Sequence, residues 1–162
     1  MTKIFAHRGA SAYAPENTME AFELAAKQGA EGIELDVHVT KDGEVVVTHD
    51  EKIDRVSNGS GFIKDMTLRE LKRLSFHNHM ESYVGAGIPT LREVLEYVST
   101  TNMDVNIELK TGIYWYPQIE EKTAFIVQET GMHDRVIYSS FNHHSIAKIK
   151  EIDSTAETAW LF

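Results

Sequence analysis

Hydrophobic and polar positions along the chain follow two periods. Short runs rich in Val and Ile, with alternating or continuous apolar positions, predict strands. Longer stretches in which apolar positions recur every three or four residues predict helices. The predicted strands cover residues 3–9, 32–40, 44–50, 104–110, 135–141 and 158–162. The predicted helices cover residues 15–29, 67–74, 88–100, 116–131 and 142–152.

Helix starts are predicted from side chains that can accept a hydrogen bond from a free amide of the first turn. The expected caps are Asn17, Thr67, Thr90 and Asn142. A glutamate stands three residues after each of the first three, as in the reciprocal capping box. The helix of residues 116–131 is expected to start at Pro117 and to end at Gly131.

The order of these elements indicates an α/β protein. The loop "KDG" at 41–43 is short enough to join two strands as an antiparallel hairpin. The other strands alternate with helices, which predicts a mostly parallel sheet, as in a doubly wound fold or a β/α barrel. Residues 51–89 interrupt the alternation and are interpreted as a small insertion in a single domain, 1–162.

The chain ends on an apolar segment, 158–162, with no helix after it. A complete eight-stranded barrel needs about 250 residues, and an unpaired edge strand is a liability that folds normally cover. We therefore expect either a fragment that stops after about the sixth strand of a longer fold, or a chain that recruits strands from another copy as a homo-oligomer.

Composition narrows the classes of partner. The chain has 162 residues, a net charge of −9 and no cysteine. Its acidity argues against nucleic acid or an anionic membrane as a partner. The lack of cysteine excludes disulfides and thiolate chemistry. No run reaches the roughly 18 apolar residues of a membrane span, and the first ten residues lack the apolar core of a signal peptide. We expect a cytoplasmic protein.

Carboxylates interrupt two of the predicted strands. Glu34 and Asp36 are two positions apart, so their side chains lie on the same face of a strand. For this pair alone, a solvated face or ion pairs with Lys or Arg is the alternative. Glu108 lies inside the apolar run "VNIELK", where solvation is harder to sustain, and this favours a metal site. Three carboxylates suit a hard cation such as Mg²⁺ or Ca²⁺, whereas zinc would draw on histidine.

Histidine, arginine and lysine side chains lie at the ends of the predicted strands. His7 and His49 each follow an apolar run, and sites of parallel α/β folds gather at the carboxyl ends of strands. Histidine can donate or accept a proton near neutral pH; a structural role is the alternative for either one. Arg8 and Lys110 could bind a phosphate group, although Lys110 could instead serve only as the counter-ion of Glu108.

Several separated motifs resemble those of the glycerophosphodiester phosphodiesterases. They are His7-Arg8 within "AHRGASAYAPENT", Glu34-Leu35-Asp36 and His49 within "GIELDVHVTKDGEVVVTHD", and "NIELK". The similarity runs from residue 4 to the last residue, with the motifs in the family's order. The resemblance implies a TIM (β/α) barrel of the phospholipase C-like phosphodiesterase type, which this chain would leave incomplete.

The same resemblance implies an activity and its residues. The reaction is hydrolysis of glycerophosphodiesters to an alcohol and sn-glycerol 3-phosphate, with one divalent cation, Mg²⁺ or Ca²⁺. The residues carried over are the metal ligands Glu34, Asp36 and Glu108, the acid–base pair His7 and His49, and the phosphate-binding Arg8 and Lys110. Two alternatives stay open. Aromatic residues at 114–116 could contact the tail of a lysophospholipid or only pack on the barrel rim, and a truncated barrel could be non-catalytic.

Overall fold

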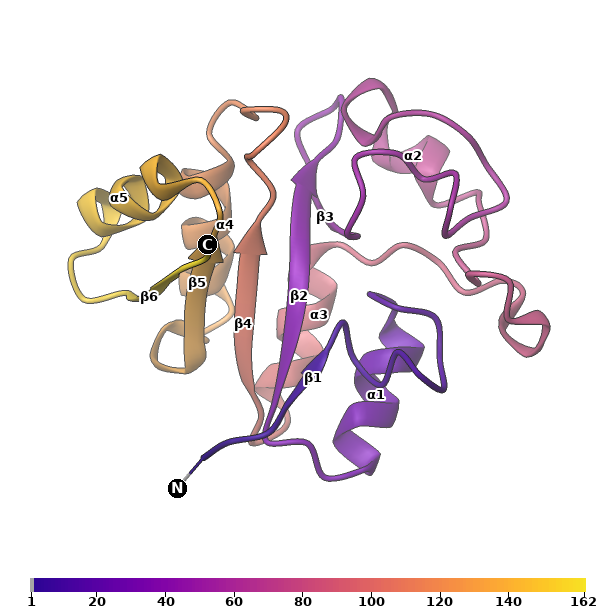
Figure 1. Ribbon diagram of the computed structural model, residues 1–162, viewed down its shortest axis with the longest axis horizontal. Coiled ribbons are helices and arrows are strands. Elements are labelled where there is room, and N and C mark those ends of the chain that lie inside the picture. Colours follow the sequence, from indigo (N-terminus) through magenta and orange to yellow (C-terminus); the bar gives the residue numbers. More distant parts are fainter. Residues whose placement is uncertain (1) are drawn as a thin grey trace.

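The computed structural model describes residues 2–162, and within them it contains six strands and five α-helices (Figure 1). The strands are β1 (Phe5–His7), β2 (Gly32–Val39), β3 (Val45–Val47), β4 (Asp104–Leu109), β5 (Val136–Ser140) and β6 (Glu157–Trp160). The α-helices are α1 (Met19–Lys27), α2 (Leu68–Leu71), α3 (Leu91–Ser99), α4 (Ile119–Glu129) and α5 (His143–Ile152). Short 3₁₀ turns cover Ile63–Asp65, Glu81–Tyr83 and His133–Arg135.

The strands form one sheet in the order β1-β2-β4-β5-β6, and all these neighbours are parallel. β3 pairs with β2 in antiparallel fashion, which confirms the predicted hairpin. Spatial order follows chain order along the sheet, without the reversal that creates the switch point of a doubly wound fold. This order is the one that a β/α barrel requires.

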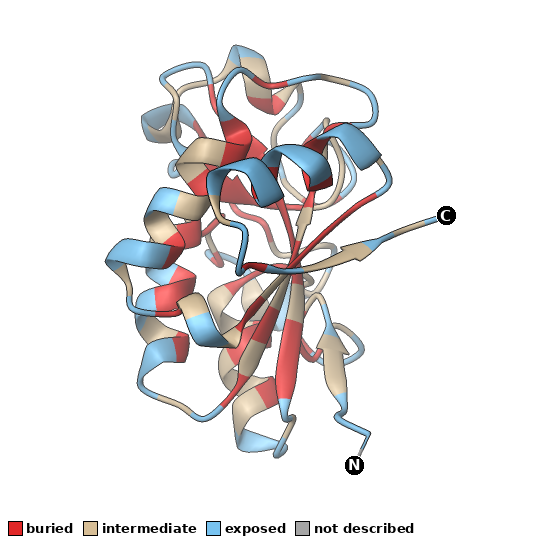
Figure 2. Ribbon diagram, turned by 90° about the vertical axis from the view of Figure 1, so that its left-hand side faces the viewer, coloured by how far each residue is buried: buried red, intermediate tan, exposed pale blue. Residues whose placement is uncertain are grey.

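The two faces of the sheet have different chemistry. Ile33, Leu35 and Val37 of β2 are fully buried and pack with Val105 and Ile107 of β4 in the main hydrophobic core. This core also contains the inward faces of α1, α3 and α4, and the buried residues concentrate where these helices meet the sheet (Figure 2). Because strand side chains alternate, the intervening positions of β2 and β4 face the other side, where the polar residues lie.

The helix caps agree with the sequence in three of four cases. The side chains of Thr67, Thr90 and Asn142 accept hydrogen bonds from first-turn amides. The expectation for Asn17 is wrong, because Thr18 caps α1 through a bond from Ala21 N. Asn17 instead has a left-handed backbone, with φ of 57°, and is buried. Its amide group is used elsewhere, as described below.

The start of α4 also differs from the prediction. The helix begins at Ile119 rather than Pro117, because Gln118 takes a left-handed conformation with φ of 62°. Its end agrees with the prediction: Gly131, with φ of 67°, follows the last turn. In the loop just before this start, Tyr116 is buried and its hydroxyl hydrogen-bonds to His38 of β2.

The segment between β3 and α3 has its own small core. Ile53, Ile63, Leu71 and Phe76 are buried together and pack against Val46 of β3. This places the segment beside the carboxyl end of β2. None of the helices described between residues 2 and 162 combines the length and the apolar character that a bilayer crossing requires.

Candidate active site

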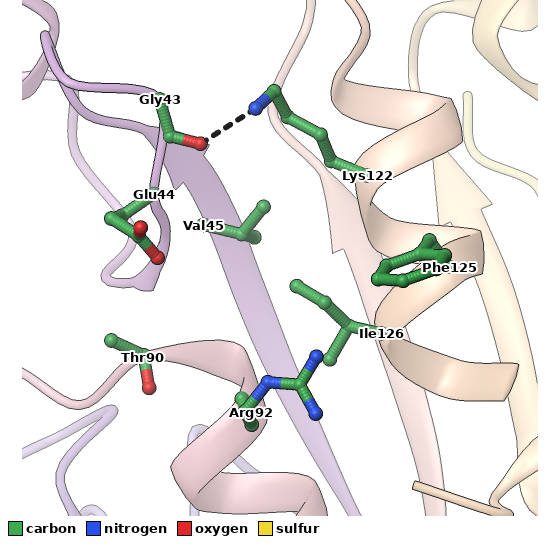
Figure 3. Close-up of a pocket in the computed structure, with 8 residues that line it drawn as sticks. All are labelled: Gly43, Glu44, Val45, Thr90, Arg92, Lys122, Phe125 and Ile126. Atoms are coloured by element: carbon green, nitrogen blue, oxygen red, sulfur yellow. Dashed lines mark hydrogen bonds between the residues drawn. The ribbon is translucent and has the colours of Figure 1, made fainter. Parts of the chain in front are cut away.

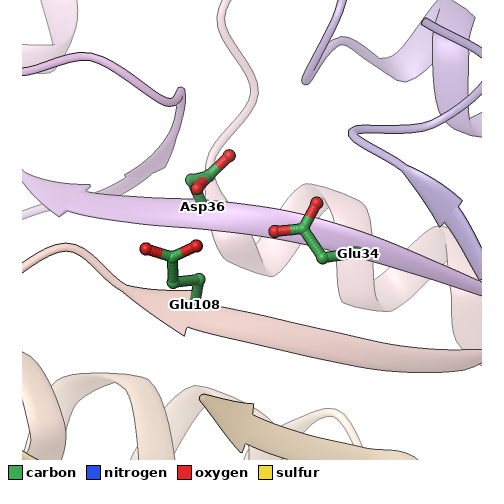
Figure 4. A group of neighbouring side chains, drawn as sticks. All are labelled: Glu34, Asp36 and Glu108. Carbon is green, nitrogen blue, oxygen red and sulfur yellow. The ribbon is translucent and has the colours of Figure 1, made fainter. Parts of the chain in front are cut away.

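The register of two strands brings the three predicted carboxylates together. Asp36 of β2 pairs with Glu108 of β4, and Glu34 lies two positions earlier on β2. The side chains converge on one face of the sheet (Figure 4). One oxygen from each carboxylate lies within 4.8 Å of the others. The spacing of E-x-D and the pairing of β2 with β4 are therefore enough to build the cluster.

The cluster is short of positive charge. Burial, with added repulsion from Asp36 and Glu108, raises the pKa of Glu34 to about 8. Asp36 is only 1% exposed, and its Oδ1 makes no hydrogen bond within the described chain. A buried carboxylate oxygen without a partner is costly unless a cation or donor satisfies it. These features fit a metal ion, which Glu34, Asp36 and Glu108 could hold.

Arg8 approaches the cluster from the end of β1. Its backbone N–H donates to both the carbonyl oxygen (3.0 Å) and the carboxylate (3.1 Å) of Glu34. To do so Arg8 takes a left-handed backbone conformation, with φ of 57°, which is costly for a residue with a Cβ. The guanidinium is thereby aimed at Asp36, with Nε 3.6 Å from Oδ2.

Lys110 approaches the same carboxylates from the end of β4. Its Nζ lies 2.9 Å from Glu108 Oε1 and 3.7 Å from Asp36 Oδ1. It also lies 3.3 Å from Nε2 of His49. Lys110 is therefore a counter-ion of Glu108, as the alternative held, but it also touches an imidazole, which a simple counter-ion would not need to do.

The two histidines are held to different degrees. His49 Nδ1 donates to Asp50 Oδ1 over 2.6 Å, so Nε2 is the ring atom that faces Lys110. His7 Nε2 lies 3.7 Å from Glu34 Oε2, and its side chain is 69% exposed. With these two, the structure brings all seven predicted site residues to one place at the carboxyl ends of the strands.

A buried histidine, His38, contacts the backbone of His49. Burial lowers the pKa of His38 to about 4, so its ring is neutral. Its Nε2 is 3.0 Å from the His49 carbonyl, to which it donates, and its Nδ1 accepts from the Tyr116 hydroxyl at 2.8 Å. His38 is thus structural rather than a surface residue. Tyr116 is also buried, so this part of the aromatic loop packs inward.

Four further residues at the site carry no prediction of a site role from the sequence. Asn17 donates its amide to Asp36 Oδ2 over 2.9 Å. Glu16, Asp50 and Arg55 form ion pairs that extend from Arg8 to His49. Only Asp50 had a local signal, since it directly follows a candidate catalytic histidine. The others meet the site through contacts between distant parts of the chain.

A separate cavity of about 260 Å³ lies outside this cluster, between the β2–β3 turn, the start of α3 and α4 (Figure 3). Lys122 reaches across it and donates to the Gly43 carbonyl at 2.8 Å. Arg92 and the Phe125 ring complete the walls shown. None of the seven predicted residues lines this cavity, so it is distinct from the polar cluster.

Fold and site together define an α/β protein of the TIM-barrel type with an acidic cluster at the carboxyl ends of its strands. The model of the glycerophosphoryl diester phosphodiesterase family matches residues 7–162. A glycerophosphodiester phosphodiesterase of Caldanaerobacter subterraneus is 50% identical over 152 residues, covering 93% of this chain and 63% of the relative. A glycerophosphodiester phosphodiesterase of Bacillus altitudinis is 49% identical, and the match covers 99% of this chain and 66% of the relative.

Solved structures agree. A phosphodiesterase of Oleispira antarctica, in complex with the product sn-glycerol-3-phosphate, has a TM-score of 0.93 at 31% identity. It is covered over 66% of its length, and this chain over 99%. A glycerophosphodiester phosphodiesterase of Agrobacterium tumefaciens has a TM-score of 0.89 at 37% identity, and the match covers 98% of this chain and 66% of that structure. The chain belongs to the glycerophosphoryl diester phosphodiesterase family, and it spans about two thirds of the length of these relatives.

Proposed function

We propose that this protein hydrolyses glycerophosphodiesters to an alcohol and sn-glycerol 3-phosphate with the help of one divalent cation. The observation that carries the proposal is the buried carboxylate cluster around Asp36, flanked by Arg8 and Lys110. Family membership supports the substrate class, as does the glycerol phosphate described in the Oleispira antarctica relative.

The proposed ligands of the cation are Glu34, Asp36 and Glu108. Carboxylate oxygens suit a hard cation, Mg²⁺ or Ca²⁺. Asp36 Oδ1 supports this assignment, because it is buried, accepts no hydrogen bond within the described residues and has Lys110 Nζ only at 3.7 Å. When bound, the cation supplies positive charge that polarises the phosphoryl oxygens. Arg8 and Lys110 would bind and orient the phosphate, since both cations already point into the cluster.

We assign the base to His49 and the acid to His7. The Nδ1–H of His49 is engaged by Asp50, so Nε2 is the atom that can accept a proton from the oxygen of the attacking water once Lys110 turns to the phosphate. As the bond from that oxygen to phosphorus forms, the bond to the alcohol oxygen breaks. The exposed His7 would give its proton to the departing alcohol.

The test is release of glycerol 3-phosphate from glycerophosphocholine, with and without EDTA. We expect turnover that EDTA abolishes and added Mg²⁺ or Ca²⁺ restores. His7→Ala and His49→Ala should each lose turnover while they keep the affinity for the cation, and the exposed His144→Ala is the matched control. Absence of metal-dependent release would refute the proposal. If the cation did not bind either, the chain would be a non-catalytic member of its family.

A second substrate class is favoured by one observation. Trp115, in the loop that follows β4, is 64% exposed, and Tyr114 is half-buried beside Phe62. An exposed indole near the carboxyl ends of the strands could contact the acyl tail of a lysophospholipid. Comparing turnover of glycerophosphocholine with that of lysophosphatidylcholine decides between the two classes, and Trp115→Ala should reduce only the second.

We also propose that the chain is one domain in which residues 51–89 form an insertion, and that it works in the cytoplasm. The small core packed against Val46 supports the insertion. Light scattering would determine whether copies associate, as the homo-oligomer prediction holds. Limited proteolysis that cut within 51–89 while leaving two stable products would contradict the single-domain proposal.

A further inference from the structure

One guanidinium group joins two carboxylates beside the candidate site. Arg55 lies in the segment after β3 and uses all three of its side-chain nitrogens. Its Nε donates to Asp50 Oδ2 at 2.7 Å. Its Nη1 and Nη2 donate to the two oxygens of Glu16 at 3.0 and 2.8 Å. This is the paired geometry in which an arginine fixes a carboxylate in orientation as well as position.

Each of these carboxylates also contacts a candidate functional group. Asp50 accepts from His49 Nδ1 at 2.6 Å through its other oxygen. Glu16 accepts from Arg8 Nη1 at 3.1 Å. An unbroken series of ion pairs therefore runs from His49 through Arg55 to Arg8. It connects the end of β3 with the loop after β1, two segments that do not pair in the sheet.

The carboxylates of Glu16 and Asp50 both stay ionised near neutral pH. Burial opposes the ionisation of Glu16, but its bonds to Arg55 and Arg8 bring its pKa below the usual value. Burial likewise opposes the ionisation of Asp50, yet its bonds from Arg55 and His49 lower its pKa to about 2. The ion pairs are thus formed throughout the neutral range.

Arg55 is a poor candidate for a phosphate ligand or for a mere stabiliser. All three of its nitrogens already bond carboxylates, so binding a phosphate would break these pairs. Its side chain is 44% exposed, and exposed ion pairs contribute little to stability, about 1 kcal/mol or less. A large effect on turnover with a small effect on stability would therefore indicate positioning.

We propose that Arg55 and Glu16 are positioning residues that hold the His49–Asp50 pair and Arg8 in one fixed arrangement. This rests on the proposed function, in which His49 accepts a proton and Arg8 binds phosphate. Asp50 keeps the Nε2 lone pair of His49 directed at the site, and Arg55 keeps Asp50 in place. Glu16 draws one end of the Arg8 guanidinium away from Asp36, which leaves the other end free to face the cluster.

The kinetic test compares Arg55→Gln with Arg55→Lys, which keeps the charge but loses the fork. The control is Arg69→Gln, a change of an exposed arginine on α2. We expect Arg55→Gln to lower kcat about 10- to 100-fold, since a misplacement of about 1 Å has that effect, and Arg55→Lys to recover only part of it. Glu16→Gln should chiefly raise KM, because it releases Arg8. The affinity for Mg²⁺, measured by calorimetry, should stay within twofold.

A readout independent of turnover separates this inference from the proposed function. In ¹⁵N spectra of the imidazoles, the neutral ring of His49 should carry its proton on Nδ1 in the unmodified protein. Arg55→Gln and Glu16→Gln should shift part of the population to the Nε2-protonated form, whereas Arg69→Gln should not. An unchanged His49 ring in folded Arg55→Gln, or a kcat within twofold of the original, would overturn the proposal. If Arg55→Gln did not fold, an unchanged His49 ring in both Arg55→Lys and Glu16→Gln would overturn it equally.

Discussion

Gly9 is a position where one added methyl group tests how the loop after β1 holds the site. It directly follows Arg8 and has φ of +79°. A Cβ on Gly9 would lie 2.7 Å from both the carbonyl carbon and the Cβ of Ala21, and 2.9 Å from the Ala21 carbonyl oxygen. These atoms belong to the first turn of α1, whose backbone cannot yield easily. Gly9→Ala should therefore displace the loop.

The size of the effect has two parts. A left-handed backbone costs an alanine about 1–2 kcal/mol, and forcing atoms into a packed interior costs about 1–3 kcal/mol more. Gly9→Ala should therefore lower the free energy of unfolding by about 2–5 kcal/mol. Gly29 provides a matched control. It also has φ of +79°, but its added Cβ would meet nothing within 4 Å. Gly29→Ala should therefore lower the free energy of unfolding only by the backbone contribution of about 1–2 kcal/mol.

Urea unfolding followed by circular dichroism measures both variants. We expect equal m-values and a larger loss for Gly9→Ala, by about 1–3 kcal/mol. Gly9→Ala should also raise KM for glycerophosphocholine, because the shifted loop carries Arg8, while Gly29→Ala should not. Equal destabilisation by the two substitutions would refute the reasoning, since the close approach to Ala21 would then be of no consequence.

Three other predictions concern the site. Glu108→Gln should weaken Mg²⁺ and Ca²⁺ binding at least tenfold in calorimetry because it removes one carboxylate of three, and the exposed Glu96→Gln should leave binding unchanged; equal binding would exclude Glu108 as a ligand. Because the pKa of Asp50 is lowered to about 2 from 3.8, its ionised form stabilises the fold above pH 4 and loses this contribution as pH falls through 2. Asp50→Asn should thus lower the free energy of unfolding by about 1 kcal/mol at pH 6, a value reduced for solvent screening at a partly exposed site, and by about half of that at pH 3. Urea titrations at the two pH values measure this difference, and a loss that did not change with pH would contradict the linkage. Tyr116→Phe leaves a buried imidazole nitrogen without its donor and should cost about 1–3 kcal/mol, whereas Tyr114→Phe, at a half-buried ring, should cost less than 1 kcal/mol; the reverse order would rule out the buried bond.

Much of the fold could be predicted because its signals are local. The two hydrophobic periods give the strands and helices, and the short loop at 41–43 gives the hairpin. Asn17 shows where local rules fail. Its capping pattern is sound, but its amide satisfies a buried oxygen of Asp36, 19 residues away. A buried carboxylate gains more from that hydrogen bond than a helix end does from one cap residue, since Thr18 can replace it as cap.

The candidate site likewise has residues that local sequence signals predict and residues that they do not. The seven predicted residues lie within or just after strands β1 to β4, and the register of these strands brings them together whatever the loops do. Arg55 has no such signal. It lies in a turn-rich segment, and its importance appears only when that segment folds back onto Glu16, 39 residues earlier in the chain. Contacts between loops depend on how the segments pack, which no periodic pattern records.

Charge balance at the centre of the site links the metal to the substrate. The pKa of Glu34, raised to about 8, keeps this carboxyl largely protonated at neutral pH, so in the bare cluster Asp36 and Glu108 already balance Arg8 and Lys110 and no positive charge is left for a phosphodiester anion. The raised pKa of Glu34 comes first from its burial and then from repulsion by Asp36. A divalent cation favours the ionised form of Glu34, and the three carboxylates, the two side-chain cations and the metal then leave one positive charge, which matches the single negative charge of a phosphodiester. Under the proposed function, the cation is therefore required to bind the substrate as well as to activate it, because Arg8 and Lys110 alone cannot neutralise both the protein and the phosphate.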